Sequence, residues 1–240
     1  MFKDDINFAK EKWDNEWSKD SELSLDDYLT NYKFNKFIKP WFYSLPKQSS
    51  VCEIGCGNGQ WLKLLRSLRD DLIYHGIDTS PVALEKIQIQ NFIAHDFDIS
   101  ILHNEYPKFD VAFSWGVVEH LHIPEVAIFN HLMISKKYVI IDVPNFYSPA
   151  TLYLNLLNKY RNVSKKKDWI VNGMRFKPND FLKNTYRLII WDPSWEIVYF
   201  GANYTVFPCI NKIISKLDSL MPNVIRKNFG HNFGVILKKI

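Results

Sequence analysis

Hydrophobic residues between positions 50 and 145 occur in short runs separated by amphipathic stretches. Runs of this length are typical of buried strands, whereas the apolar stripe between Trp61 and Leu68 has helical spacing. Ser80 followed by Pro81 supplies an N-cap and a first-turn proline for another helix. The alternation predicts repeated strand-helix units and a parallel sheet. The expected strands are 51–54, 72–77, 92–94, 111–113 and 138–143.

The pattern changes at both ends of this region. Residues 1–47 place aromatic and aliphatic residues among charges, which predicts a helical N-terminal cap, and residues 48–240 form the remaining domain. After Pro144 the alternation stops until two further apolar runs at 195–200 and 233–237. An interruption of this length is typical of an inserted functional segment.

Length and composition favour one α/β domain with additions. The chain has 240 residues, 47% of them hydrophobic, so it can bury a sizeable core. A net charge of +4 is too mild for a nucleic-acid footprint, and no apolar stretch has membrane-spanning length. The cysteines Cys52, Cys56 and Cys209 lack metal-ligand spacing, which favours a reducing, cytoplasmic setting. The composition leaves the oligomeric state open.

A glycine turn follows the first expected strand. Gly55, Gly57 and Gly59 lie between that strand and a helix that begins near Gln60, so the backbone can approach a ligand closely. A dinucleotide turn of the form G-x-G-x-x-G would need glycine at position 60, which disfavours a nicotinamide cofactor. Glu53, directly before the turn, disfavours a pyrophosphate and suits a partly cationic ligand.

The segment Glu53-Ile54-Gly55-Cys56-Gly57-Asn58-Gly59 resembles the first motif of class I S-adenosylmethionine-dependent methyltransferases. The resemblance extends over about residues 50–145 and implies S-adenosylmethionine as the cofactor. It also implies a Rossmann-like α/β fold, with helices on both faces of a mostly parallel seven-stranded sheet whose last strand is antiparallel. Three further matches fall at strand ends: Asp78 with Thr79, Asp96 with Phe97, and Ser114 with Trp115.

The resemblance assigns a role to each match. Asp78 would accept hydrogen bonds from the ribose hydroxyls, Asp96 would accept from the adenine amino group, and Phe97 would cover the ring. The segment that begins at Ser114 would lie beneath the methionine end of the cofactor. Each residue alone has a structural alternative, such as a tight turn or a helix cap. Four matches in order on successive strand ends favour the cofactor site.

His120 is the candidate catalytic residue. Methyl transfer depends mostly on positioning, but a hydroxyl acceptor benefits from a base, and His120 follows the fourth expected strand. A histidine bonded to a loop carbonyl is the structural alternative, and His122 is a weaker candidate. Some related O-methyltransferases carry a metal-assisting glutamate where this chain has Gly116, so we expect no metal.

The additions should select the acceptor. The segment from Pro178 resembles the helix before the family's sixth strand, which places an inserted substrate cap at about 145–176. Its aromatic and basic residues favour a small hydroxylated metabolite, such as a sugar or sugar nucleotide, over nucleic acid or membrane. A methyltransferase acting on nucleic acid or protein and a non-catalytic cofactor-binding domain stay open as alternatives. The N-terminal segment, with Trp13 and Trp17, should fold over the cofactor.

Overall fold

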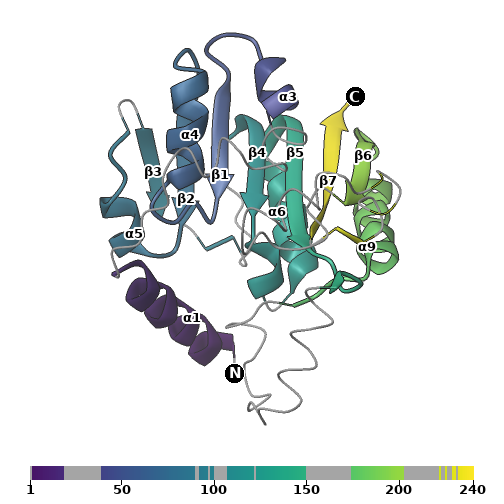
Figure 1. Ribbon diagram of the computed structural model, residues 1–240, viewed down its shortest axis with the longest axis horizontal. Coiled ribbons are helices and arrows are strands. Elements are labelled where there is room, and N and C mark those ends of the chain that lie inside the picture. The colour runs from purple at the N-terminus through teal and green to yellow at the C-terminus, as the bar shows by residue number, and fades with distance from the viewer. Residues whose placement is uncertain are drawn as a thin grey trace.

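The computed structural model describes residues 2–18, 39–89, 92–96, 98–99, 107–121, 123–149, 174–202, 222, 225, 229–230 and 232–240. Within these residues, seven strands form one sheet in the order β3-β2-β1-β4-β5-β7-β6 (Figure 1). The strands are β1 Ser50–Ile54, β2 Ile73–Asp78, β3 Phe92–Asp96, β4 Phe109–Trp115, β5 Ser135–Pro144, β6 Trp195–Ala202 and β7 Asn232–Lys239.

The first five strands are parallel, and β7 runs antiparallel to both β5 and β6. The predicted fold class, a mostly parallel seven-stranded sheet with an antiparallel last strand, is therefore confirmed. The described helices are α1 Phe2–Trp17, α3 Lys39–Tyr43, α4 Gln60–Leu68, α5 Pro81–Glu85, the 3-10 helix η2 Val118–His120, α6 Pro124–Ile134 and α9 Pro178–Trp191.

Helices cover the two faces of the sheet with separate apolar cores. Alternate residues of a strand point to opposite faces, so Ile140 packs with α3 and α4, whereas Val139 and Ile141 pack with α6 and α9. The N-cap predicted before α5 is present, because Ser80 Oγ accepts a hydrogen bond from the Ala83 N–H at 3.2 Å.

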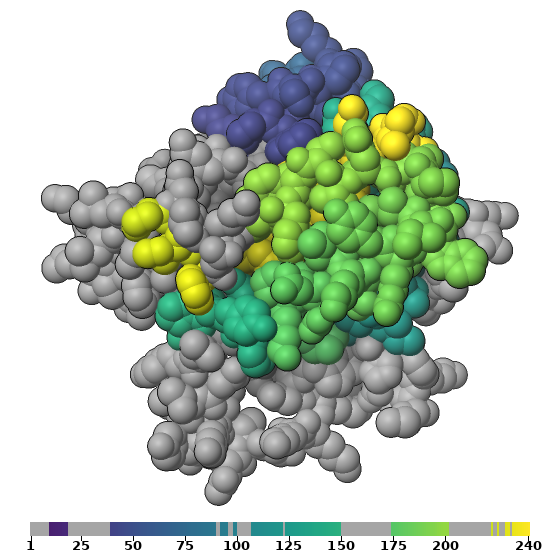
Figure 2. All heavy atoms as spheres, turned by 90° about the vertical axis from the view of Figure 1, so that its right-hand side faces the viewer, coloured from purple at the N-terminus to yellow at the C-terminus, as the bar shows by residue number. Residues whose placement is uncertain are grey.

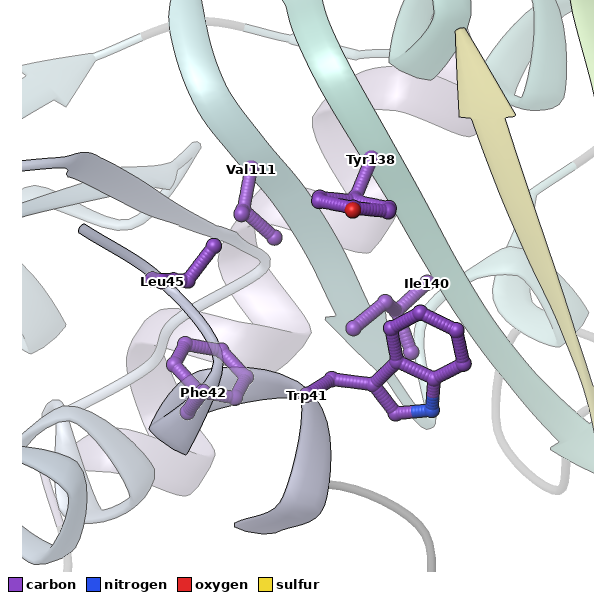
Figure 3. Close-up of a pocket in the computed structure, with 6 residues that line it drawn as sticks. All are labelled: Trp41, Phe42, Leu45, Val111, Tyr138 and Ile140. Carbon is purple, nitrogen blue, oxygen red and sulfur yellow. The ribbon is translucent and has the colours of Figure 1, made fainter.

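Arg69 holds α3 against the rest of the domain. Its guanidinium donates to the carbonyl oxygens of Phe42 at 2.8 Å and Leu45 at 3.1 Å, and also to both carboxylate oxygens of Asp71. Beneath α3, Trp41, Phe42 and Leu45 face Val111, Tyr138 and Ile140 across a shallow apolar pocket (Figure 3). This pocket lies in the amino-terminal half of β4, at the level of Val51, so it is remote from the glycine turn.

Two predicted regions extend outside the described residues. Residues 19–38 separate α1 from α3, and residues 150–173 make up most of the expected insert. The helical cap over 1–47 and the inserted cap over 145–176 therefore stay predictions. None of the helices within the described ranges combines the length and apolar character needed to cross a membrane.

Candidate functional site

The parallel strands end at one edge of the sheet, and α1 lies across that edge (Figure 1). The glycine turn leaves β1 here, with φ angles of 67° at Gly55, 52° at Gly57 and 73° at Gly59. The N–H groups of Gly55 and Cys56 both donate to the carbonyl oxygen of Ile77, at 2.7 and 3.1 Å. The turn is therefore fixed to the carboxyl end of β2.

Gly57 is packed too closely for any side chain. A Cβ atom at this position would lie 2.2 Å from the Trp17 ring, and one at Gly55 would lie 2.3 Å from the Val117 side chain. Positive φ angles add strain for any residue with a Cβ. The glycines thus allow α1 and the loop after β4 to approach the turn backbone.

Asp78 joins the end of β2 to the glycine turn. Its Oδ2 accepts from the Gly57 N–H at 2.8 Å, and its Oδ1 accepts from the Ser80 N–H at 2.9 Å. Burial raises the pKa of Asp78, those backbone N–H groups oppose the rise, and the nearby Asp14 carboxylate adds to it. Each carboxylate oxygen can accept a further hydrogen bond, so capacity remains for a ligand hydroxyl.

Glu53 is a buried acid beneath the same turn. Its side chain is 2% exposed, and within the described part of the chain its Oε2 has no hydrogen-bond partner. Burial raises the pKa of Glu53 well above its usual range, and the charge of Asp78 raises it further. An unsatisfied buried carboxyl oxygen fits a cationic group of a ligand, so the residues present suit an amino acid sulfonium.

Helix α1 contacts three of the loops at this edge. Trp17 covers Gly57, Asp14 Oδ1 accepts from the Ser80 hydroxyl at 2.5 Å, and the Trp13 ring meets His120 edge-to-face with centroids 5.1 Å apart. Positions 13, 14 and 17 share one face of a helix because residues three and four apart are neighbours. This face of α1 therefore spans the glycine turn, the β2–α5 turn and η2.

The end of β4 supplies a second wall. Trp115 lies against Trp61 of α4, with ring centroids 4.6 Å apart and an interplanar angle of 33°. Ser114 is fully buried, and its Oγ has no hydrogen-bond partner among the described residues. Gly116 follows with a φ of 71°, which turns the chain into η2.

The base of the expected insert is held beside η2. The Met174 N–H donates to the carbonyl oxygen of Glu119 at 2.7 Å, and the Phe176 N–H donates to that of Pro144 at 3.1 Å. Arg175 lies between these two anchors, and the Glu119 side chain is 4% exposed. The two ends of the insert, Asn145 and Phe176, form a parallel bridge.

The carboxyl ends of β5 and the start of β7 close this side of the site. Asn232 donates to Asp142 Oδ1 at 2.6 Å, and Asn145 donates to the carbonyl oxygen of Gly230 at 2.9 Å. Both Asp142 and Asn145 are fully buried. Buried polar groups of this kind fix the relative position of strands whose sequences are far apart.

The structure brings most of the expected site residues together. The expected residues that lie at this edge are Glu53, the glycine turn with Cys56, the pair Asp78 and Thr79, the pair Ser114 and Trp115, and His120. The backbone of Asp96 pairs with Asp78, but its side chain lies outside the described part of the structure, as do Phe97 and His122. The expected aromatic and basic residues of the insert other than Arg175, Phe176 and Tyr147 also lie outside it.

Sequence reasoning missed Asp14, although it carried a signal, since it shares a helical face with Trp13 and Trp17. Val117 and Glu119 were placed in the segment that follows Ser114, but the sequence did not predict their individual contacts. Within the residues that the structure describes, no three His, Cys, Asp or Glu side chains gather as a metal site would require.

Comparisons with known proteins show the family and the fold of this chain. Residues 28–181 match the family described as "Methyltransferase domain". A curated relative, the carboxy-S-adenosyl-L-methionine synthase of Campylobacter jejuni, is 27% identical over 135 residues, which cover 52% of this chain and 57% of the relative. The chain thus matches little more than half the length of that relative.

Two solved structures share the fold. The magnesium protoporphyrin IX methyltransferase of Synechocystis PCC 6803, with bound SAH, has a TM-score of 0.60 at 14% identity and covers 98% of this chain and 100% of its own. The plantazolicin methyltransferase BpumL, in complex with a substrate analog and SAH, has a TM-score of 0.58 at 16% identity and covers 99% and 91%.

Proposed function

Because this chain belongs to the methyltransferase domain family, we propose that it transfers a methyl group from S-adenosylmethionine to an oxygen of a small hydroxylated metabolite. The family match confirms the predicted resemblance, and with it the enzyme class and the methyl donor of the family. The acceptor, the residues that act on it and a cytoplasmic setting are our proposal.

One observation carries the donor site: the unsatisfied carboxyl oxygen of Glu53 beneath the glycine turn. When bound, the donor supplies an electrophilic methyl group on a sulfonium with a good leaving group. Glu53 would face the ammonium of the donor, and Asp78 would accept from its ribose hydroxyls with the capacity left on each oxygen. Asp96 and Phe97 would hold the adenine.

Helix α1 would act as a cover over the donor. Its Trp13 and Trp17 rings reach His120 and Gly57, so the helix lies between the expected reaction centre and solvent. A cover that excludes water strengthens the electrostatic contacts inside and prevents loss of the methyl group to water. Asp14 would hold the cover in place through Ser80.

His120 would accept the proton of the acceptor hydroxyl. It ends η2, directly after the strand whose end faces the donor, and a neutral imidazole nitrogen can take a proton as the oxygen is methylated. The neighbouring backbone of Met174 to Phe176 would bring Arg175 to the acceptor side, where a guanidinium suits a phosphate or carboxylate.

A sugar or sugar nucleotide is our preferred acceptor. Tyr147 is 44% exposed near the base of the insert, and an aromatic face together with Arg175 suits a sugar ring that carries an anion. An acceptor in nucleic acid or protein is the main alternative. The relative from Campylobacter jejuni is named carboxy-S-adenosyl-L-methionine synthase. A reaction that modifies the donor itself is therefore a second alternative.

A panel of acceptors tests the proposal. Sugar nucleotides, free sugars, phenols, tRNA and peptides are incubated with the protein and donor, and release of the demethylated donor is measured. We expect turnover on a sugar class, and turnover on tRNA or peptide alone would overturn that choice. Donor binding without turnover on any acceptor would favour a non-catalytic domain.

His120→Ala is measured beside the unaltered protein. We expect turnover to fall by roughly 10²-fold or more, the usual contribution of a positioned base, while donor affinity is unchanged. Undiminished turnover would remove the base and leave positioning as the mechanism. The His120→Phe variant keeps a ring against Trp13 but removes the proton acceptor, so it separates loss of the base from loss of the Trp13 contact.

A further inference from the structure

Three acidic side chains from separate elements gather where helix α1 crosses the site. Glu53 is buried beneath the glycine turn, and Asp78 accepts a hydrogen bond from that turn at the end of β2. Asp14 comes from α1, which lies across the same edge of the sheet and away from the β6 side of the molecule (Figures 1 and 2). Within the described residues, none of these three acids forms an ion pair with a lysine, arginine or histidine. Their negative charge is therefore not balanced by a neighbouring cation of the described chain.

Asp14 and Asp78 bind the same residue. The Ser80 hydroxyl donates to Asp14 Oδ1 at 2.5 Å, and the Ser80 N–H donates to Asp78 Oδ1 at 2.9 Å. Two carboxylates on neighbouring atoms of one residue repel each other. Burial raises the pKa of Asp78 and the charge of Asp14 adds to that rise, while burial and then the charge of Asp78 raise the pKa of Glu53. The charge of Asp14 therefore reaches the groups expected to bind the donor.

Lys12, the cation of α1 closest in sequence to Asp14, is directed elsewhere. Its ammonium lies 3.9 Å from the centroid of the Trp13 ring. Burial lowers the pKa of Lys12, and the charge that opposes this shift is that of Glu16 rather than Asp14. A positively charged ligand would therefore relieve the repulsion among the acids of the site.

We propose that Asp14 shifts the selectivity of the site toward the methylated donor and away from its demethylated product, an inference that rests on the proposed methyl transfer. Donor and product carry the same adenosine and amino acid groups. They differ at the sulfur, which is a positively charged sulfonium in the donor and a neutral thioether in the product. Asp14 bonds to Ser80, so it acts on the ligand through its charge, and charge is what separates the two ligands.

Glu53 and Asp78 are less suited to this distinction. On the proposed assignment, Glu53 faces the ammonium and Asp78 accepts from the ribose hydroxyls, and donor and product share both of these groups. Loss of either residue should therefore weaken the binding of both ligands. Once the methyl group is transferred, the sulfonium charge is gone and Asp14 is attracted to the ligand less strongly. Helix α1 would then hold the product less tightly than the donor.

Calorimetry with S-adenosylmethionine and with its demethylated product tests the proposal. In Asp14→Asn the amide oxygen can still accept from the Ser80 hydroxyl, so the substitution removes the charge and keeps the hydrogen bond. We expect the donor to bind about threefold to tenfold more weakly and the product to bind as before, which also reports correct folding. Glu16→Gln is the matched control. It removes an exposed acid from the opposite side of the same helix and should leave the ratio of the two affinities unchanged.

Ionic strength supplies a second measurement. The Debye length falls from about 30 Å at 0.01 M salt to about 3 Å at 1 M, so attraction between separated charges weakens over this range. The ratio of donor affinity to product affinity should fall as salt is added, and the fall should be smaller in Asp14→Asn. A helix that only packs over the site would not make this ratio depend on salt.

Two outcomes overturn the proposal. One is that Asp14→Asn changes the donor and product affinities equally or changes neither, which would make α1 a cover without charge selectivity and leave the proposed transfer intact. The other is that the unaltered protein binds neither ligand, which would overturn the donor site as well. The two failures are distinguishable because only the second removes donor binding from the unaltered protein.

Discussion

The two halves of the carboxyl edge are built differently. In the donor half, short-range elements meet: the glycine turn, the end of β2 and the start of α5 are joined through Asp78. In the acceptor half, the contacts join distant parts of the chain, since Asn232 and Asp142 are 90 residues apart. On the proposed assignment, the cofactor would be held by contacts between neighbouring elements, and the acceptor by pairing of distant parts of the chain.

The buried acids of the donor half affect the stability of the protein. The donor half keeps acidic groups buried without full hydrogen bonding, and burial raises the pKa of both Glu53 and Asp78. Such groups cost stability unless a ligand satisfies them. The acceptor half buries carboxyl groups as well, at Glu119 and Asp142, and there Asp142 Oδ1 accepts from Asn232 of β7 while Asn145 donates to the Gly230 carbonyl. We expect ligand binding in the donor half to depend on the ionisation of Glu53 and Asp78.

The largest effect should follow from Gly57→Ala. The added Cβ would meet the Trp17 ring at 2.2 Å and require a positive φ, so we expect donor affinity to fall by about 3 kcal/mol, roughly 100-fold, in calorimetry. Gly116→Ala is the matched control in the other half. Its φ is also positive, at 71°, but its nearest neighbour is Glu119 Oε1 at 3.6 Å.

For Gly116→Ala we expect only backbone strain, about 1 kcal/mol of unfolding free energy in thermal melts, with little change in donor affinity. In Gly57→Ala, a second change of Trp17→Ala should restore part of the affinity because it removes the clashing ring. Equal losses of affinity for the two glycine variants would contradict the distinction between the halves.

Asp78→Ala should rank next. It removes the acceptor for the Gly57 and Ser80 N–H groups and for the expected ribose hydroxyls, so donor affinity should fall by about 1–3 kcal/mol. Asp71→Ala is the control, because this carboxylate pairs with Arg69 away from the turn and should affect stability alone. Unchanged donor affinity in Asp78→Ala would exclude the ribose assignment.

Glu53→Gln should raise stability while it weakens donor binding. Burial raises the pKa of Glu53, so the folded state holds the proton more tightly than the unfolded state. That stability is complete below the unfolded pKa and is lost as pH rises through the folded pKa. Glutamine avoids the loss, and we expect a gain of about 1–2 kcal/mol near neutral pH.

The same substitution should reduce the pH dependence of donor affinity. In the unaltered protein, donor affinity should increase with pH as Glu53 ionises opposite the ammonium. In Glu53→Gln this increase should become smaller, which calorimetry at several pH values measures. A variant that is less stable at neutral pH and binds the donor normally would contradict the role given to Glu53.

The smallest effect concerns the cover. Trp17→Ala should reduce donor affinity by about 1 kcal/mol through loss of the aromatic contact on the turn, and removal of residues 1–36 should do the same while leaving a folded core. Trp41→Ala, at the apolar pocket under α3, should lower stability without changing affinity. Full affinity in the truncated protein would contradict the cover.

The sequence predicted the fold well where the information is local. The seven strands and the cap at Ser80 follow from apolar runs and turn residues, and the resemblance to the family supplied the start of α9 at Pro178. Strand ends were less accurate: β3 continues to Asp96 and β5 begins at Ser135, because ladder hydrogen bonds include polar residues that a search for apolar runs leaves out.

For the site, too, the sequence predicted features of short segments better than contacts between distant residues. The glycine turn and Asp78 were predicted from short motifs, whereas the bond between Asp14 and Ser80 joins positions 66 residues apart, and the helical face of Asp14 does not reveal its partner. The anchoring of Met174 by the Glu119 carbonyl is a backbone contact, which side-chain patterns do not encode. Contacts of this kind depend on how the completed sheet brings its ends together.

The place of β7 between β5 and β6 also constrains the order in which the sheet can form. Strand β6 precedes β7 in the chain, yet among the described strands β6 pairs with β7 alone, and β7 also covers one side of β5. Until Asn232–Lys239 inserts, β5 presents an apolar open edge, the kind of surface that chaperones bind and that aggregates form on. Insertion of this strand covers that edge of β5 and pairs β6 with the rest of the sheet.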